Sequence, residues 1–398
     1  MSMPVSRQGW VIVGAVAVIL AIAMGQLVNG LSVFFVPLEA EFGWPRGAVA
    51  LINSAGLAGL AIGGIVMGAV ADRTPIRRVA LAGTTAVGLC VMLAAGASGL
   101  WQFYLLFFVA GIFGAGLFAP LFALIGGWFP AGAGLAIGIA SAGQAAGQGG
   151  VPFLAAWLIE QLGWRGAFLV LGLASIAVMV PLAMLMREPQ RAVGGVAMRA
   201  EPAPPIPPRL AVAWLSAATL LCCACMSVPL MHLVPLIQGL CISGTDASGV
   251  LFAMLMAAIL GRVAFGKLAD LIGPIPAYMT ASLWQTSAVF AFTRLTDLGQ
   301  FYLFAPIYGF GYAGVMTTVL VTARMLTPAA QRATLMGVIL GFAWIGHAVG
   351  GFQAGLFFDL TGSYALGFGA AALAGIVNLA LVALLFLRVR RRQASAMA

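Results

Sequence analysis

The sequence predicts an all-α membrane protein of twelve membrane-crossing helices, arranged as two six-helix bundles. Hydrophobic residues make up 63% of the 398 residues and charged residues only 7%. Mean hydropathy is +1.09, far above the range of soluble proteins. Apolar runs of the roughly 20 residues that cross a bilayer core recur along the whole chain. Because a membrane barrel strand needs only about half that length, we expect helices.

The twelve apolar runs are separated by short polar interruptions. The first run is as long as a span, and no small-residue cleavage site follows it before Pro37, so we expect it to remain as a helix. The expected spans are Trp10–Phe35, Ala48–Val70, Val79–Ala97, Gln102–Gly126, Leu135–Ile159, Gly166–Met186, Leu210–Ile237, Ser248–Leu268, Ile275–Phe292, Phe301–Ala323, Ala333–Phe358 and Tyr364–Leu387.

Basic residues are distributed unevenly between the two sides of these spans. With the N-terminus in the cytoplasm, 15 of the 19 basic residues fall inside, and only Arg46, Arg165 and Arg294 fall outside. This asymmetry follows the positive-inside rule, so we expect both termini to be cytoplasmic. The net charge of +9 then reflects topology, and we expect no nucleic-acid partner. The excess of arginine over lysine and the 52 glycines favour a bacterial inner membrane.

The longest polar interruption, Arg187–Arg209, divides the spans six and six. We expect residues 1–186 to form an N-terminal six-helix bundle, 187–209 a cytoplasmic linker, 210–387 a C-terminal six-helix bundle and 388–398 a cytoplasmic tail. Six spans return the chain to the same side of the membrane. The two bundles should therefore be parallel repeats related by a pseudo-two-fold axis along the membrane normal.

Short segments of the two halves match at a nearly constant offset. The matching pairs, at offsets of 198 or 199 residues, are Gly63–Asp72 with Gly261–Asp270, Gly138–Gly147 with Gly337–Gly346, and Leu162-Gly163 with Thr361-Gly362. Internal repeats of this size in a twelve-span chain indicate a secondary transporter.

One polar loop carries a recognisable motif. Gly68–Arg78, which reads GAVADRTPIRR, resembles the signature loop of the major facilitator superfamily, with Pro75 where that motif usually has glycine. The resemblance implies the major facilitator fold, in which Asp72 and the neighbouring arginines can pair with helix ends and close the cytoplasmic side. We expect gating residues in this loop, at the repeat-related position and near the outer end of span seven: Asp72, Arg73, Arg77, Arg78, Lys267, Asp270 and His232.

Within that superfamily, several segments are similar to the monocarboxylate porters and the oxalate:formate antiporters. Two departures stand out: basic residues are absent after Trp128-Phe129, and Ala258 stands where those porters carry an acidic residue. The similar segments are Pro37–Arg46 (PLEAEFGWPR), Gly134–Gly147 (GLAIGIASAGQAAG), Gly163–Phe168 (GWRGAF), His232–Pro235 (HLVP) and Asp359–Tyr364 (DLTGSY). This resemblance implies transport of a small organic anion.

Arg262 lies inside the eighth apolar run with no acidic residue near it. A guanidinium stays charged, so burying it in a bilayer costs at least a few kcal/mol, and such residues are usually functional. Its planar fork can donate two parallel hydrogen bonds to a carboxylate. The alternative is that it snorkels or caps backbone carbonyls. The resemblance places Arg262 on the arginine that monocarboxylate porters use for the substrate carboxylate.

Other polar and aromatic residues also lie near the centres of spans. His347, close to where the oxalate:formate antiporters carry a lysine, can pair with a second carboxylate, carry a proton or simply pack. We expect the substrate site to include these central residues, although each could also serve helix packing or helix–helix hydrogen bonds: Gln26, Asn29, Gln144, Gln148, Tyr308, Tyr312, Trp344 and His347.

Several functions are disfavoured by what the spans lack. All ten acidic residues fall at span ends or in loops, which disfavours cationic substrates and the usual proton relay. The sequence has no HExxH or GxSxG motif, and Cys222, Cys223 and Cys225 have no His or carboxylate at ligand spacing. We therefore expect no catalytic residues, no cofactor and no metal site.

The expected function is secondary active transport of a small organic anion, a mono- or dicarboxylate, by alternating access. A proton or a counter-anion would be the coupled species, the bilayer the only other partner, and the chain a monomer. The alternative is an exporter of the same fold with a largely apolar cavity. A membrane sensor or intramembrane enzyme is the third reading, and it would need an output domain or catalytic set that the sequence lacks.

Overall fold

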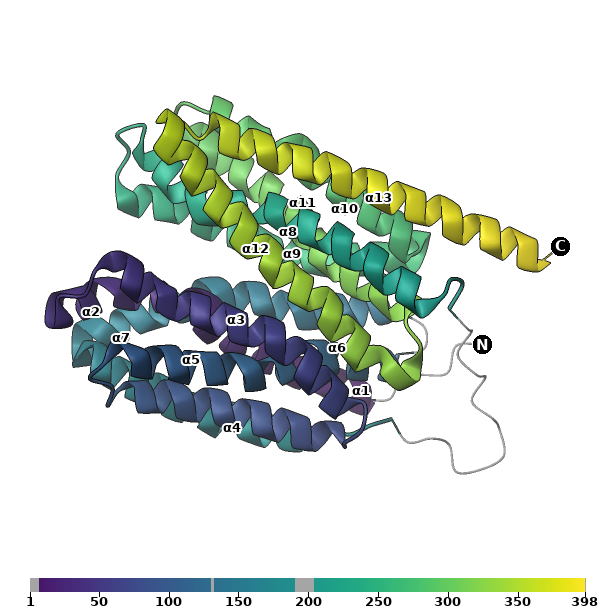
Figure 1. Cartoon of the computed structure of the whole chain (residues 1–398), viewed down its shortest axis with the longest axis horizontal. Coiled ribbons are helices and arrows are strands. Elements are labelled where there is room, and N and C mark those ends of the chain that lie inside the picture. The colour runs from purple at the N-terminus through teal and green to yellow at the C-terminus, as the bar shows by residue number, and fades with distance from the viewer. Residues whose placement is uncertain (1–6, 130–131, 190–203, 398) are drawn as a thin grey trace. The chain divides into compact units, whose positions relative to one another are not determined.

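The computed structural model describes residues 7–129, 132–189 and 204–397, and the regular elements in these ranges are helices (Figure 1). Short π or 3₁₀ segments are η1 (Gly25–Asn29), η2 (Gly30–Phe34), η3 (Ala115–Leu117), η4 (Phe290–Arg294) and η5 (Ala329–Gln331). The α-helices are α1 (Arg7–Met24), α2 (Phe35–Phe42), α3 (Arg46–Ala71), α4 (Ile76–Ala94), α5 (Leu100–Gly114), α6 (Ala119–Trp128), α7 (Ala133–Met184), α8 (Pro208–Gln238), α9 (Gly244–Ile272), α10 (Pro274–Val289), α11 (Leu298–Leu326), α12 (Arg332–Thr361) and α13 (Ala365–Met397).

The described helices account for all twelve predicted spans. Ten of them are long and apolar enough to cross a membrane. Helix α7, with 52 residues, contains both the fifth and the sixth predicted span, which are separated where Gly163 takes a positive φ of 70°. The ninth span is the 16-residue α10 extended by η4.

Two predicted spans differ from continuous helices. The first is α1 followed by the π turn η1, the 3₁₀ turn η2 and then α2, so the helix changes its winding at Gly25–Phe34. The fourth is α5 and α6 joined through η3. A change of winding redirects side chains, and such turns are common at functional sites.

The structure describes nearly all of the predicted C-terminal tail but only part of the predicted linker. The predicted linker falls largely on residues 190–203, which lie outside the described residues. Helix α13 continues past the predicted end of span twelve at Leu387 and through the expected tail to Met397. The predicted division of the chain into domains stays a prediction.

The chain separates into two compact units. The first comprises Met1–Ala131, Ile139–Ala203 and Pro328–Gly341, and the second comprises Gly132–Gly138, Pro204–Thr327 and Phe342–Ala398. In the first unit α5 packs against α3 and α4, and in the second α9 packs against α11 and α8 against α13 (Figure 1). The first turns of α7 thus belong to the second unit, and the first turns of α12 to the first.

The internal repeat is visible in the packing of each unit. In the first unit, a Cβ placed on Gly63 would overlap the carbonyl oxygen of Ile112 at the contact between α3 and α5. In the second unit, Gly261 makes the same contact with Phe310 between α9 and α11. Gly261 and Phe310 each lie 198 residues after their counterparts Gly63 and Ile112, the offset that the sequence match predicts. Glycine allows these helix backbones to approach closely in the membrane.

The repeat also explains a backbone conformation. Gly43 follows α2 with φ of 66°, and Cys241, 198 residues later, has φ of 62°. Cys241 is the only non-glycine residue with positive φ among the described residues. A side chain in this left-handed region costs about 1–2 kcal/mol, a cost that glycine avoids.

Replacing Cys241 with glycine is therefore expected to stabilise the protein by about 1 kcal/mol, which would raise the melting temperature by about 1–2 °C. Thermal unfolding in detergent measures the change. Cys241→Ser is the control, because it removes the thiol but keeps a side chain at the same φ. Equal stabilisation by both substitutions would show that the thiol, and not the backbone conformation, was responsible.

Candidate substrate site and helix-end contacts

Arg262 lies on α9 and is only 4% exposed. It interacts electrostatically with Tyr312 on α11 and with His347 on α12, all within the second unit. A Cβ on Gly138 would lie 2.6 Å from the carbonyl oxygen of Arg262, so the first turns of α7 pack directly against this point of α9. The structure thus brings two predicted site residues, Tyr312 and His347, next to the buried cation of a third, Arg262.

Tyr308 and Tyr312 are one turn apart on α11 and fully buried. Their rings stack with centroids 5.4 Å apart and an interplanar angle of 14°. The rings of Phe292 and Tyr308 pack edge to face, with centroids 5.1 Å apart. Neither tyrosine hydroxyl has a hydrogen-bond partner in the described part of the chain. A buried hydroxyl without a partner costs free energy, so these groups are candidates for contact with a ligand or water.

Trp344 and His347 lie one turn apart on α12, with ring centroids 6.0 Å apart. Both side chains are half-buried. The imidazole of His347 interacts electrostatically with the guanidinium of Arg262. His347 therefore belongs to the Arg262 cluster, and the cluster is cationic through Arg262.

The first unit offers neutral amide groups. Gln144 and Gln148 on α7 are buried, at 8% and 7% exposed, and Asn29 at the end of η1 is half-buried. The side-chain oxygens of Asn29 and Gln148 have no hydrogen-bond partner among the described residues. Asn53 on α3 has a partnerless amide oxygen as well. It lies within the second predicted span and was missed at the sequence level.

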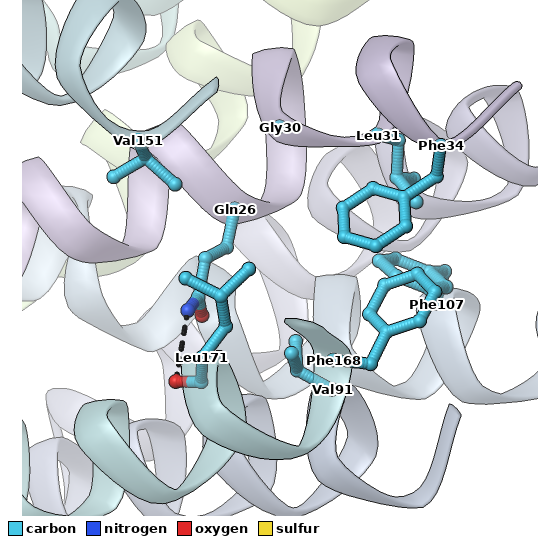
Figure 2. A pocket seen from close by; sticks show the side chains of 9 residues that line it. All are labelled: Gln26, Gly30, Leu31, Phe34, Val91, Phe107, Val151, Phe168 and Leu171. Atoms are coloured by element: carbon cyan, nitrogen blue, oxygen red, sulfur yellow. Dashed lines mark hydrogen bonds between the residues drawn. The ribbon is translucent and has the colours of Figure 1, made fainter. Parts of the chain in front are cut away.

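Gln26 has a different environment (Figure 2). Its amide nitrogen donates to the carbonyl oxygen of Leu171 at 3.3 Å, the bond drawn in Figure 2. It also donates to Ser175 Oγ at 2.6 Å, and both acceptors are on α7. It borders a void of about 10 Å³, large enough for roughly one water. The other lining residues are Gly30, Leu31, Phe34, Val91, Phe107, Val151, Phe168 and Leu171. The two bonds of the amide nitrogen hold η1 against α7. The amide oxygen of Gln26 has no hydrogen-bond partner among the described residues, so its role in substrate binding stays a prediction.

His232 lies on α8, where its Nε2 atom is 2.8 Å from the carbonyl oxygen of Gly351 on α12. Its ring centroid is 5.4 Å from that of Tyr364, in the turn before α13. The histidine thus connects α8 with the body of α12 and with the turn before α13. An outer gating role for His232 stays a prediction.

Asp72 accepts hydrogen bonds at the N-terminus of α12. The donors are the backbone N–H of Ala333 at 3.1 Å, the backbone N–H of Thr334 at 2.9 Å, and the hydroxyl of Thr334. These N–H groups have no partner within their helix, and the helix dipole favours a negative charge at this end. Asp72 therefore binds a helix end, as the motif predicts.

Asp270 repeats this contact at α7. Its carboxylate accepts hydrogen bonds from the backbone N–H groups of Gly134 and Leu135, both at 2.8 Å. Each residue of this contact matches a residue of the Asp72 contact at the repeat offset of 198 or 199 positions. Leu135 replaces Thr334, so the second contact lacks the side-chain hydrogen bond of the first.

The basic residues predicted for the gates lie on the surface near these contacts. Arg73, Arg77, Arg78 and Lys267 are exposed side chains. In the hydrogen bonds described above, the two carboxylates accept from backbone N–H groups at helix N-termini. Gating by the basic residues stays a prediction.

A second charged cluster joins segments of the first unit that were noted only for their resemblance to carboxylate porters. Glu41 at the end of α2 accepts hydrogen bonds from Trp164 Nε1 at 2.5 Å and from Arg165 at 2.7 Å. Arg165 also donates to the carbonyl oxygens of Ala95 and Ala97 and stacks over the Trp164 ring at 4.2 Å. The cluster fixes the break in α7 against the end of α2. The distance between the two segments does not follow from the sequence, so this pairing was not predicted.

Comparison with known proteins identifies the class of protein that this fold and site define. The family model of the Major Facilitator Superfamily matches residues 13–240. The solved structure of the proton:xylose symporter XylE superposes with a TM-score of 0.74 at 14% identity, covering 94% of this chain and 95% of that one. The chain belongs to the major facilitator superfamily, has its twelve-helix fold and is a membrane transporter rather than an enzyme.

Two curated relatives are similar to this chain over most of its length. Monocarboxylate transporter 13 of Rattus norvegicus is 27% identical, covering 92% of this chain and 87% of its own length. The 3-(3-hydroxy-phenyl)propionate transporter of Escherichia coli (strain K12) is also 27% identical, covering 93% of this chain and 90% of its own length. The predicted resemblance to monocarboxylate porters is confirmed.

Proposed function

We propose that this chain is a secondary active transporter that moves a small organic anion, a mono- or dicarboxylate, by alternating access. One observation carries the proposal: Arg262, buried on α9 within an apolar run that contains no acidic residue, lies beside Tyr312 and His347. Burying a guanidinium within the membrane is costly, and a carboxylate substrate bound to it offsets part of that cost.

The neighbouring groups complement a carboxylate chemically. The guanidinium of Arg262 can donate two parallel hydrogen bonds to the two carboxylate oxygens. The partnerless hydroxyls of Tyr308 and Tyr312 can donate further hydrogen bonds. Their stacked rings present an apolar wall to the carbon skeleton of the substrate.

The relatives support an anionic substrate. Both are named for the transport of carboxylic acids, one for monocarboxylates and one for an arylpropionate. If the protein were an exporter with a largely apolar cavity, Arg262 would have no function in binding the substrate. A buried charge in such a cavity would weaken the binding of apolar compounds, because its desolvation would not be compensated.

For gating, we propose that the Asp72 and Asp270 contacts stabilise the state in which the cytoplasmic side is closed. Arg262 and Asp270 are eight residues apart on α9, or about 12 Å along the helix. Both meet the first turns of α7, Arg262 through Gly138 and Asp270 through Gly134. Substrate binding at Arg262 therefore acts on the same helix pair as the Asp270 contact. Cytoplasmic termini and a bacterial inner membrane complete the proposed topology.

Uptake into proteoliposomes tests the proposed function. The purified protein would be given a panel of radiolabelled mono- and dicarboxylates, with and without a pH gradient and with the same or another carboxylate inside. Uptake driven by the pH gradient would identify proton coupling, and uptake dependent on internal anion would identify exchange. Transport of uncharged or cationic compounds, with none of any carboxylate, would exclude the proposal.

His347→Gln is expected to change the pH dependence of transport, with a loss of rate smaller than that caused by changes at Arg262. The imidazole can exchange a proton near neutral pH, whereas the amide cannot. Initial uptake rates between pH 5 and pH 8 measure the effect. Trp344→Phe, one turn away on α12, is the control that keeps an aromatic side chain. A profile for His347→Gln parallel to that of the wild type would assign the histidine to packing.

A further inference from the structure

A groove of about 460 Å³ lies in the second unit between the first turns of α8 and the last turns of α13. Its lining has two chemical halves. One half is apolar, with Leu384 and Leu387 exposed at 53% and 48%. The other half is basic. The full lining is Trp214, Leu384, Leu387, Arg388, Arg391 and Arg392.

Trp214 contacts α13 near the apolar half of the groove and Arg388 in the basic half. Its indole Nε1 donates a hydrogen bond to the carbonyl oxygen of Leu381 at 2.7 Å, which fixes the ring against α13. The guanidinium of Arg388 lies 6.0 Å from the ring centroid, within the range of a cation–π contact. The groove is therefore bounded by an oriented ring as well as by exposed arginine side chains.

The position of the groove matches the boundary between hydrocarbon and headgroups. The candidate membrane span of α13 runs over Ala365–Arg392, so the basic half of the groove falls at the last turn of that span. The leucines lie one or two turns earlier, on the apolar part of the helix. Tryptophan and arginine are the residues typical of this interfacial layer.

We infer that this groove is a binding site for an anionic phospholipid. The headgroup phosphate is bound by Arg388, Arg391 and Arg392, and an acyl chain lies along Leu384 and Leu387. The phosphate suits the arginines because it accepts paired hydrogen bonds from guanidinium groups. Free phosphate would satisfy the basic half alone, whereas a phospholipid satisfies both halves. Basic pockets between membrane helices bind anionic headgroups in this manner.

The chain contains its own matched control. Arg390 lies on the same turn of α13 and is exposed, but it does not line the groove. Arg390→Gln and Arg391→Gln change the net charge equally and at nearly the same depth. Any difference between them reports the groove and not the general attraction of a basic helix end to anionic lipid.

The test is native mass spectrometry of the full chain, titrated in detergent with phosphatidylglycerol or phosphatidylcholine. We expect phosphatidylglycerol to bind preferentially, and Arg391→Gln and Arg388→Gln each to weaken it about fivefold. Arg390→Gln should bind like the wild type. Trp214→Leu should also weaken binding, because it removes the oriented ring while all the charges remain. Melting curves of each variant in detergent establish that it is folded.

Three results would overturn the inference: equal losses for Arg390→Gln and Arg391→Gln, equal binding of the two lipids, or displacement of the lipid by millimolar inorganic phosphate. The last would identify a free-phosphate site. Lipid binding is measured without transport, so its failure would leave the proposed carboxylate transport untouched.

Discussion

Replacing Arg262 with glutamine is expected to abolish detectable binding of the transported carboxylate while leaving the protein folded. The substitution removes the buried cation of the cluster but keeps a side chain that can donate hydrogen bonds. Losing one partner of a desolvated charge pair costs about 2–5 kcal/mol, which corresponds to a loss of affinity of at least about 30-fold. The variant should also be as stable as the wild type or more stable, because an intramembrane charge has been removed.

Thermal unfolding with and without substrate measures both effects. A ligand that binds only the folded protein raises the melting temperature by mass action, so the wild type should show a shift at saturating carboxylate. Arg262→Gln should show no shift at the same concentration. Arg262→Lys keeps the charge and loses the bidentate fork, so it should give a smaller shift and severely reduced transport.

An unchanged substrate-induced shift in Arg262→Gln would assign the arginine to a structural role and remove the main support for the proposed site. The His347→Gln protein serves as a comparison in the same assay. It should retain most of the shift, because the main counter-charge remains in place.

Replacing Asp72 with asparagine is expected to slow turnover about 5- to 30-fold with little change in substrate affinity. The carboxylate accepts bonds from Ala333 and Thr334 at the N-terminus of α12, and its charge interacts with the helix dipole. Such a contact contributes about 1–2 kcal/mol in a partly buried setting. If the contact exists in only one state of the transport cycle, its loss changes the balance between states and not the binding chemistry.

Turnover from uptake rates and affinity from thermal shifts are compared for the same variants. Thr334→Val is the graded control, because it removes the hydroxyl bond and leaves both backbone N–H groups bound. It should have a smaller effect than Asp72→Asn. Asp270→Asn should resemble Asp72→Asn, since Asp270 makes the equivalent contact with Gly134 and Leu135. Equal losses of turnover and affinity would argue against gating.

Most of the fold could be predicted from the sequence, because bilayer physics leaves few options for apolar runs of span length. The repeat could also be predicted, and the contacts of Gly63 and Gly261 confirm its offset. The interruption of the first span at Gly25–Phe34 could not. The segment carries polar residues such as Gln26 and Asn29, but no local pattern specifies a π turn, and the close approach of Gly25 to Val151 of α7 is a contact between distant segments.

The candidate site could be predicted only in part. Arg262 and His347 stood out because an ionisable residue is rare in an apolar run, and the structure places them in one cluster. Gln26 was grouped with them on its central position; the hydrogen bonds of its amide nitrogen to α7 could not be predicted, and its part in substrate binding stays a prediction. Asn53 was missed because a single amide within a span has no distinguishing pattern. Contacts between distant segments, such as Glu41 with Arg165, require the fold itself.

The strained turn at Cys241 has a practical consequence. Cys90, Cys222, Cys223 and Cys225 are buried, and Cys241 is the exposed one of the five cysteines. The wild-type chain therefore carries a single accessible thiol, located in the connection between the seventh and eighth spans. A membrane-impermeant maleimide added to intact cells should modify this position if the proposed topology holds. The same thiol would accept a fluorophore, so the movement of this connection can be followed without first building a cysteine-free variant.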